Sequence, residues 1–193
     1  MSDFYNLVSF DPSPLSVADF KAYSRIDTAD DDALIESMIE AATEFGEKYT
    51  ARDFRAKEYQ LFLDCFSDRI KIRRDPVDTI DSVEHIVNDV FAVVDPSIYY
   101  LKSLTQCSEL LLKSGESWPT DTDDREQAIE VTFTTAGYYC QEQIIEALKL
   151  IVAYMYANRG DCSGGGSGSC SCDNAAKGSG AIGLLDLMTI GRV

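Results

Sequence analysis

The segment TADDDALIESMIEAATEFGEKY, residues 28–49, contains the clearest helical pattern in the amino-acid sequence. Its opening, Thr28-Ala29-Asp30-Asp31, resembles a capping box with acidic residues in the first turn. Apolar residues follow at spacings of three and four, which places them on one stripe of a helix: Leu34, Met38, Ala41, Phe45 and Tyr49. The segment therefore predicts an amphipathic helix of about 20 residues.

The chain on either side of this helix changes character. Residues 1–14 predict an irregular arm, and Ser16 then caps a short first helix. From Arg55 the apolar residues follow a period of two, which is typical of strands. Further short strands are predicted at Ile70–Ile72, Ser82–Val87, Leu110–Lys113 and Ile129–Thr134. These strands predict a small antiparallel sheet or sandwich inserted between helices.

A helical period returns over residues 141–158, and this late helix is apolar on nearly all sides. Such a helix must be buried nearly all round, which exceeds what one small domain normally demands. We therefore expect it to pack against other subunits through an apolar set: Ile144, Ile145, Leu148, Ile151, Val152, Met155 and Tyr156.

The C-terminal part has two characters. Residues 160–181 are rich in Gly, Ser and Cys and predict a flexible linker. Residues 182–193 are apolar again, and an apolar end beyond a flexible linker is not explained as a solubilising tail. We expect this end to dock on a partner or on a neighbouring subunit through Leu184, Leu185, Leu187, Met188, Ile190, Arg192 and Val193.

Together these segments predict an α+β fold. The expected architecture is a helical bundle, formed by the N-terminal helices and the long late helix, with an inserted small antiparallel β subdomain and a flexible C-terminal tail. The predicted parts are an N-terminal arm with bundle helices, a β-rich insertion, the late bundle helix, the linker and the docking segment: residues 1–54, 55–137, 138–159, 160–181 and 182–193.

Charge restricts the classes of partner. The chain of 193 residues carries 17 basic and 33 acidic side chains, a formal net charge of -16. That balance argues against nucleic-acid binding through clustered Lys and Arg, and against binding to an anionic membrane surface. It is compatible with work beside DNA if the task is to repel it. The sequence has no apolar stretch of about 20 residues and no signal-peptide pattern, which predicts a protein made in the cytosol with reduced cysteines.

Candidate chemical sites are weak. Cys162, Cys170 and Cys172 form too small and too closely spaced a group for a typical zinc site, although a disulfide there stays open, and the chain has one histidine, His85. The acidic group Asp30-Asp31-Asp32 begins a helix, and the group Asp121, Asp123 and Asp124 lies in a turn-rich loop. Phosphate-binding and nucleophile-elbow motifs are absent from the sequence. We predict no cofactor, no metal, no catalytic residue and no enzymatic activity.

Several motifs in order carry a family resemblance. They include LSVADFKAYSRID at residues 15–27, YTAR at 49–52, DPVDTIDSV at 75–83, VTFTTAGY at 131–138 and YANR at 156–159. Over about residues 15–159 the chain resembles the head-to-tail connector (adaptor) family of long-tailed phages, in its longer form with a β insertion. It departs from that family in lacking a proline before the late helix and in the ending of its tail.

The resemblance implies a structural virion protein of the neck, made in the host cytoplasm. It implies a ring, expected to be a dodecamer, that docks on the portal protein and contacts a stopper or tail-completion protein. Double-stranded DNA is expected to pass through the lumen of this ring without specific binding. Alternative readings are another neck or tail-completion ring subunit, a monomeric α+β binding module and, last, a small metal-dependent enzyme.

Overall fold

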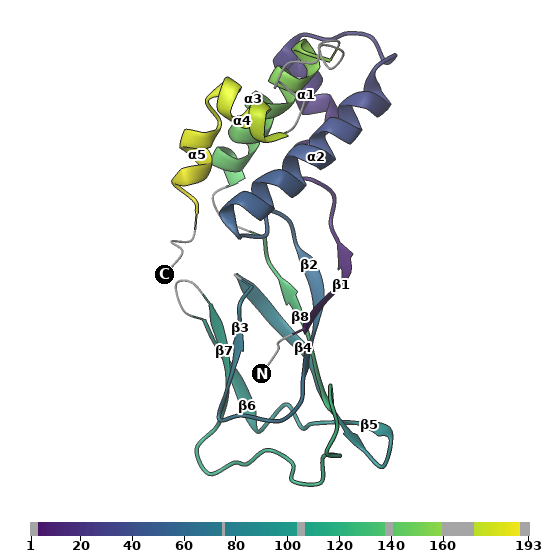
Figure 1. The fold of residues 1–193 in the computed structure, drawn as a ribbon, viewed down its shortest axis with the longest axis vertical. Helices are drawn as coiled ribbons and strands as arrows, with labels where there is room; N and C mark the ends of the chain where they lie inside the picture. Colours follow the sequence, from purple (N-terminus) through teal and green to yellow (C-terminus); the bar gives the residue numbers. More distant parts are fainter. Residues whose placement is uncertain (1–3, 75, 104–106, 138–140, 160–171, 190–193) are drawn as a thin grey trace. The chain divides into compact units, whose positions relative to one another are not determined.

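The structure is a computed structural model, and it describes residues 4–74, 76–103, 107–137, 141–159 and 172–189. The chain forms two compact units, each built from separate stretches of sequence. The β unit comprises residues 1–11 and 55–137, and the helical unit comprises residues 12–54 and 138–193 (Figure 1).

Two antiparallel sheets make up the β unit. The larger has the strand order β1-β2-β8-β4-β5, and the smaller has the order β3-β7-β6. The strands of the larger sheet are β1 Phe4–Phe10, β2 Lys57–Leu63, β8 Ile129–Thr135, β4 Val77–Val87 and β5 Val90–Val93. Those of the smaller sheet are β3 Arg69–Ile72, β7 Ser108–Leu112 and β6 Tyr99–Ser103.

Strict alternation along β2 and β8 creates the core of the β unit. Every second residue of both strands is buried, and the register places Leu61 opposite Val131 and Tyr59 opposite Phe133. The Tyr59 and Phe133 rings stack with centroids 5.6 Å apart. Trp118 stacks on Phe66 at 4.7 Å, and its indole N–H donates to the Ser67 carbonyl over 3.0 Å. The indole is thus buried with its one polar group satisfied.

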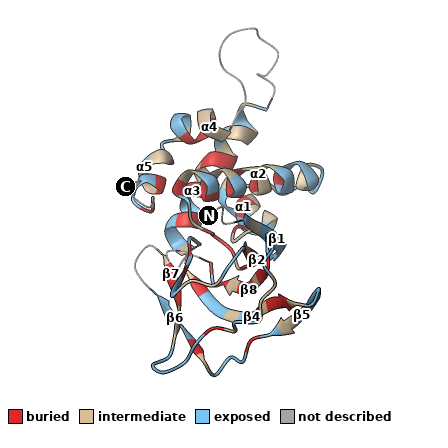
Figure 2. Ribbon diagram, turned by 60° about the horizontal axis from the view of Figure 1, so that its bottom comes forward, coloured by how far each residue is buried: buried red, intermediate tan, exposed pale blue. Residues whose placement is uncertain are grey.

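The helical unit contains α1 Val17–Ser24, α2 Asp32–Thr50, α3 Gln141–Ala157, α4 Cys172–Ser179 and α5 Ile182–Asp186. As expected, Ser16 caps α1, because its Oγ accepts a hydrogen bond from the Asp19 N–H. The helices share one apolar core, visible as the buried positions in Figure 2. At Gly46 of α2 the Phe54 ring approaches so closely that an added Cβ would lie 2.5 Å from it, which explains a glycine inside this helix.

The predicted helix at residues 28–49 is confirmed as α2, and the four short strands predicted at Ile70, Ser82, Leu110 and Ile129 are confirmed as β3, β4, β7 and β8. The predicted fold class is wrong. The β unit is no small insertion in a helical bundle, because it has eight strands in two sheets among its described residues.

Two local patterns explain the error. Residues 1–14 were expected to be an irregular arm, yet Phe4–Phe10 form β1, which pairs with β2. A strand at the edge of a sheet is held by one partner and needs no buried face, so it lacks the strong alternation that identifies β2. At the other end, residues predicted as flexible linker and tail form α4 and α5, which pack on the helical core. No helix in the described part of the chain has the length and apolarity to cross a membrane.

Candidate functional site

The apolar late helix α3 is covered mainly from within its own unit. Ile144, Leu148, Ile151 and Val152 are buried in the helical core, and Ile145, Met155 and Tyr156 are half-buried against it. Sequence reasoning assigned all seven residues to subunit packing because it did not foresee α4 and α5, which also contact α3. Burial inside one chain accounts for much of the apolarity of α3, and a contact between copies through its half-buried residues stays a prediction.

The C-terminal docking segment divides into an inward and an outward side. Leu185 and Met188 are buried in the helical core, and Leu184 is half-buried beside them. Leu187 is the exception, with 74 % of its surface exposed. The remaining predicted docking residues, Ile190, Arg192 and Val193, lie outside the described residues. Of the described docking residues, Leu187 is therefore the one that presents a large apolar surface outward.

Polar contacts with α2 and the residues just after it hold the same segment. The Tyr49 hydroxyl donates to Asp186 Oδ1 over 2.6 Å, and Arg52 Nε donates to the Met188 carbonyl over 2.7 Å. The hydrogen bond to the Asp186 carboxylate, together with burial and the nearby negative charge, raises the pKa of the Tyr49 phenol above its usual value. A second pair of this kind occurs at Tyr156, whose hydroxyl donates to Asp31 Oδ2 and whose pKa is likewise raised, first by that bond.

The raised pKa of Tyr49 predicts a pH dependence for the α5 contact. A phenol whose folded pKa exceeds its unfolded value of about 10 contributes stability below that value and loses it as pH rises through the folded pKa. We therefore expect the α5 contact to weaken as pH rises through the folded pKa of Tyr49, and Tyr49→Phe to abolish that pH dependence. Proteolysis after residue 171, followed between pH 9 and about 12, measures the release; an unchanged profile in Tyr49→Phe would contradict the assignment.

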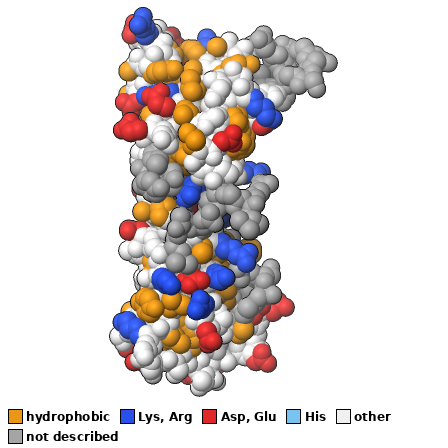
Figure 3. Space-filling view, turned by 90° about the vertical axis from the view of Figure 1, so that its left-hand side faces the viewer, with side chains coloured by type: hydrophobic (Ala, Val, Ile, Leu, Met, Phe, Trp, Pro, Cys, Tyr) orange, Lys and Arg blue, Asp and Glu red, His pale blue; other side chains and the backbone are white. Residues whose placement is uncertain are grey.

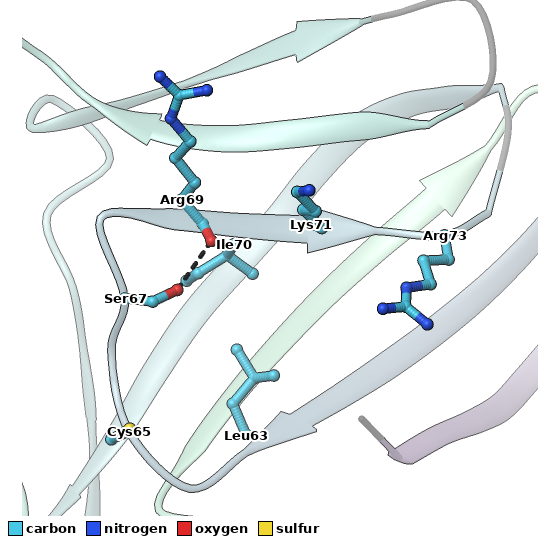
Figure 4. Close-up of a pocket in the computed structure, with 7 residues that line it drawn as sticks. All are labelled: Leu63, Cys65, Ser67, Arg69, Ile70, Lys71 and Arg73. Carbon is cyan, nitrogen blue, oxygen red and sulfur yellow. Dashed lines mark hydrogen bonds between the residues drawn. The ribbon is translucent and has the colours of Figure 1, made fainter. Parts of the chain in front are cut away.

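The outer face of the smaller sheet carries a basic surface. Arg69 and Lys71 are exposed and alternate along β3 with the buried Ile70 and Ile72. Figure 4 shows Arg69, Ile70 and Lys71. Lys102 of β6 and Lys71 both lie opposite Glu109 of β7, so all three share this face. Figure 3 shows Lys and Arg side chains gathered there among apolar ones. In a chain of net charge -16 this basic surface reverses the sign of the charge locally. The alternation of basic and apolar residues along β3 was the sequence signal that could have predicted it.

A shallow pocket lies beside this basic surface. It is lined by Leu63, Cys65, Ser67, Arg69, Ile70, Lys71 and Arg73, and the Ser67 hydroxyl donates to the Arg69 carbonyl at its rim (Figure 4). The Arg73 backbone N–H donates to the Tyr5 hydroxyl, which joins β3 to β1 of the larger sheet. The lining of the pocket has cationic groups but no arrangement of acid, base and nucleophile. The pocket can therefore contact an anion, and it shows no evident catalytic arrangement.

Each acidic group contains a residue with a structural partner. Asp32 pairs with Lys21 at 2.6 Å, and Asp123 accepts hydrogen bonds from the backbone N–H groups of Asn88 and Asp89. Those two backbone bonds hold the pKa of the Asp123 carboxyl below its usual value. Within the described ranges, no group of three or more possible ligands is arranged to hold a metal ion.

The cysteines and the histidine do not meet in the described structure. Cys65 is exposed, and Cys107 and Cys172 are half-buried free thiols. Burial raises the pKa of the Cys172 thiol, which disfavours the thiolate, the reactive form of cysteine. Cys140, Cys162 and Cys170 lie outside the described residues. The His85 ring contacts the Thr122 hydroxyl at 3.0 Å and the Phe66 ring, so it belongs to the packing of the β unit.

Comparison with known proteins gives a family match over part of the chain and a shared fold. Residues 14–92 match the family described as phage gp6-like head-tail connector protein, which confirms the resemblance over that segment. A chain of the neck of an empty gene transfer agent particle, computed with C6 symmetry, is 22% identical with a TM-score of 0.72. The alignment covers 98% of this chain and 97% of that one.

A second solved structure, the neck of the native particle computed with C12 symmetry, contains a chain 20% identical with a TM-score of 0.67. This second alignment also covers 98% of this chain and 97% of the other chain. At these identities the two likenesses show a shared fold, and they show it over both units. A search of curated proteins found no match.

Proposed function

We propose that this chain is a structural subunit of a particle neck. It matches the phage head-tail connector family over the segment that contains its first helices, and it shares the fold of a particle neck protein over nearly its whole length. The observation that carries this proposal is the family match, because it rests on sequence in the segment that contains α1 and α2. The described surface, which has no evident catalytic arrangement, supports a structural role over an enzymatic one.

In its finer form, the proposal is a ring of identical subunits that docks on the portal and meets a stopper or tail-completion protein. The symmetric neck structures of similar fold support a ring. We propose a dodecamer by analogy with the neck computed with C12 symmetry, and another neck or tail-completion subunit is the alternative. Localisation in the neck of the virion, after synthesis in the host cytoplasm, belongs to the same proposal.

The outer face of the larger sheet is the candidate wall for DNA. It carries acidic and hydroxyl side chains on its central strands, where Glu58, Glu84 and Glu130 alternate with buried residues. Gln60 donates to Glu130 over 2.7 Å, and Thr134 donates to Asp81 over 2.8 Å, so the face is held by its own hydrogen bonds. Such a surface repels phosphates, and it suits a duplex that must slide past without binding.

The docking residues of the tail have a place in this proposal. Leu184, Leu185, Leu187, Met188, Ile190, Arg192 and Val193 were predicted to reach a portal or a neighbouring subunit. Because Leu185 and Met188 are buried in their own unit, the contact with a partner would fall to the exposed Leu187 and to the residues after Met188. The helical unit would then be already folded when it presents its C-terminal end to the partner.

Native mass spectrometry of the purified chain, alone and mixed with portal rings of the same particle, tests the proposal. We expect either a ring or a monomer that joins the portal in multiple copies, and in both cases no added mass when a short DNA duplex is supplied. A chain that remains monomeric at high concentration and ignores the portal would contradict the connector role. Stable binding of the duplex would contradict the repelling wall alone.

A further inference from the structure

The two edge strands of the larger sheet expose apolar side chains. At one edge, β1 is exposed along nearly its whole length, and Phe4 and Phe10 each have 54 % of their surface exposed. At the other, Val90 and Val93 of β5 are 67 % and 66 % exposed, and Phe91 is 51 % exposed. Large apolar side chains gathered on an open strand are a liability for a lone molecule and mark a surface that a partner covers.

The register places the two apolar edges at the ends of one cross-strand row. Phe4 lies opposite Phe62, Phe62 opposite Glu130, Glu130 opposite Glu84, and Glu84 opposite Val93. The acidic residues of this row thus occupy its centre, and its two ends are apolar. The Phe4 and Phe62 rings already contact each other, with centroids 6.0 Å apart. Two copies that met edge to edge would join apolar ends and keep their carboxylates apart.

The hairpin that presents β5 is braced from the loop after β7. Asn88 and Asp89 both adopt positive φ angles, 50° and 62°, as the tight turns of hairpins require. The Asp123 carboxylate accepts their two N–H groups over 3.1 and 2.9 Å, and Arg125 pairs with Asp89 at 3.2 Å. A fixed turn lowers the entropy lost when β5 meets a partner.

From these observations we propose that the β1 edge of one copy meets the β5 edge of the next, so that the larger sheet continues from subunit to subunit. This inference rests on the proposed ring. A head-to-tail contact that closes into a ring needs two different surfaces at opposite ends of one subunit, and β1 and β5 are the two ends of the strand order. Contact between identical edges would give closed dimers instead.

The direction of the strands adds a specific feature. Each of the four pairings β1·β2, β2·β8, β8·β4 and β4·β5 is antiparallel, so β1 and β5 run in the same direction within one sheet. Rotation about a ring axis preserves that direction when the strands run along the axis. The junction between copies is therefore parallel, although every strand pairing in the described part of the chain is antiparallel.

Photo-crosslinking tests the junction in the full-length ring. In Phe91→p-benzoylphenylalanine, assembled from equal amounts of ¹⁵N-labelled and unlabelled copies, we expect crosslinks from position 91 to peptides containing Phe4–Phe10 of another copy. The matched control is Tyr100→p-benzoylphenylalanine, an aromatic position of similar exposure on the smaller sheet, which gives no crosslink to β1. Crosslinks from β5 to β5, or to any surface other than β1, would overturn the proposal.

A charge variant gives an independent measurement. Val93→Asp places a carboxylate at the apolar end of the row, and we expect it to weaken self-association about 100-fold while its circular dichroism matches wild type. Tyr100→Asp is the control and leaves self-association unchanged. A ring that forms normally with Val93→Asp overturns the junction and leaves the connector role intact. A wild-type chain that never forms a ring, alone or on the portal, overturns both.

Discussion

The substitution Leu185→Asp is expected to lower the free energy of unfolding of the helical unit by about 3–5 kcal/mol, since it places a carboxylate without a partner in an apolar core. Leu185 has no exposed surface and belongs to the same buried cluster as Ala181 and Met188. The loss is large against a typical total of about 5–15 kcal/mol. Denaturant unfolding followed by far-UV circular dichroism measures it.

Leu187→Asp is the matched control, with the same change of residue type two positions along. Because Leu187 is 74 % exposed, we expect its stability to stay within about 0.5 kcal/mol of wild type. The two variants together separate folding from docking. If Leu187→Asp folds normally and loses affinity for the portal, the tail has an outward role; equal destabilisation by the two substitutions would contradict the placement of α5.

The second large effect is expected in the β unit. Phe133→Ala removes a fully buried ring that stacks on Tyr59 at 5.6 Å and meets the Tyr5 ring edge-on at 6.4 Å. We expect a loss of about 3–5 kcal/mol, because the neighbouring rings cannot collapse fully into the cavity. Near-UV circular dichroism of the tyrosines and a denaturant midpoint measure the change.

Tyr100→Ala, an exposed aromatic position in the same unit, provides the comparison and is expected to cost little. A Phe133→Ala chain as stable as Tyr100→Ala would show that β2 and β8 do not pack as described. Comparing Phe133→Ala with Leu185→Asp also tells whether the two units unfold in one transition or in two, since each substitution lies in the core of a different unit.

The sequence predicted those elements whose burial alternates strongly. The apolar period over residues 34–49 predicted the helix α2, although its buried residues, such as Ile35, Ile39 and Ala42, lie one position along from the predicted stripe. The alternation in Ile129–Thr134 predicted β8 together with its buried face. β1 was not predictable, because its register comes from pairing with β2 some fifty residues away and only Tyr5 among its residues is half-buried. Tertiary pairing, which local pattern does not contain, determines such a strand.

The same limit applied to the candidate surfaces. The late helix was judged too apolar for one small domain, and the residues that cover it, such as Ala176 and Leu185, were assigned to linker and tail. Ala175 and Ala176 allow close approach of α4 to α3, and a sequence with small residues around glycines resembles a linker in composition. The apolar edges at β1 and β5 became visible only when the strand order was known, because neither strand carries an unusual motif.

The interleaving of the two units has a consequence for synthesis of the chain. The β unit needs nothing beyond residue 137, whereas the helical unit draws on residues 12–54 and then on residues from 138 onward. During translation the sheets can therefore close while α2 still lacks α3, α4 and α5, and its core residues Ile35, Ile39 and Ala42 stay uncovered until those helices have formed. Translation order thus delays completion of the helical unit until Met188 has emerged from the ribosome. The edge strands of the larger sheet can therefore form in the nascent chain before the helical unit is complete.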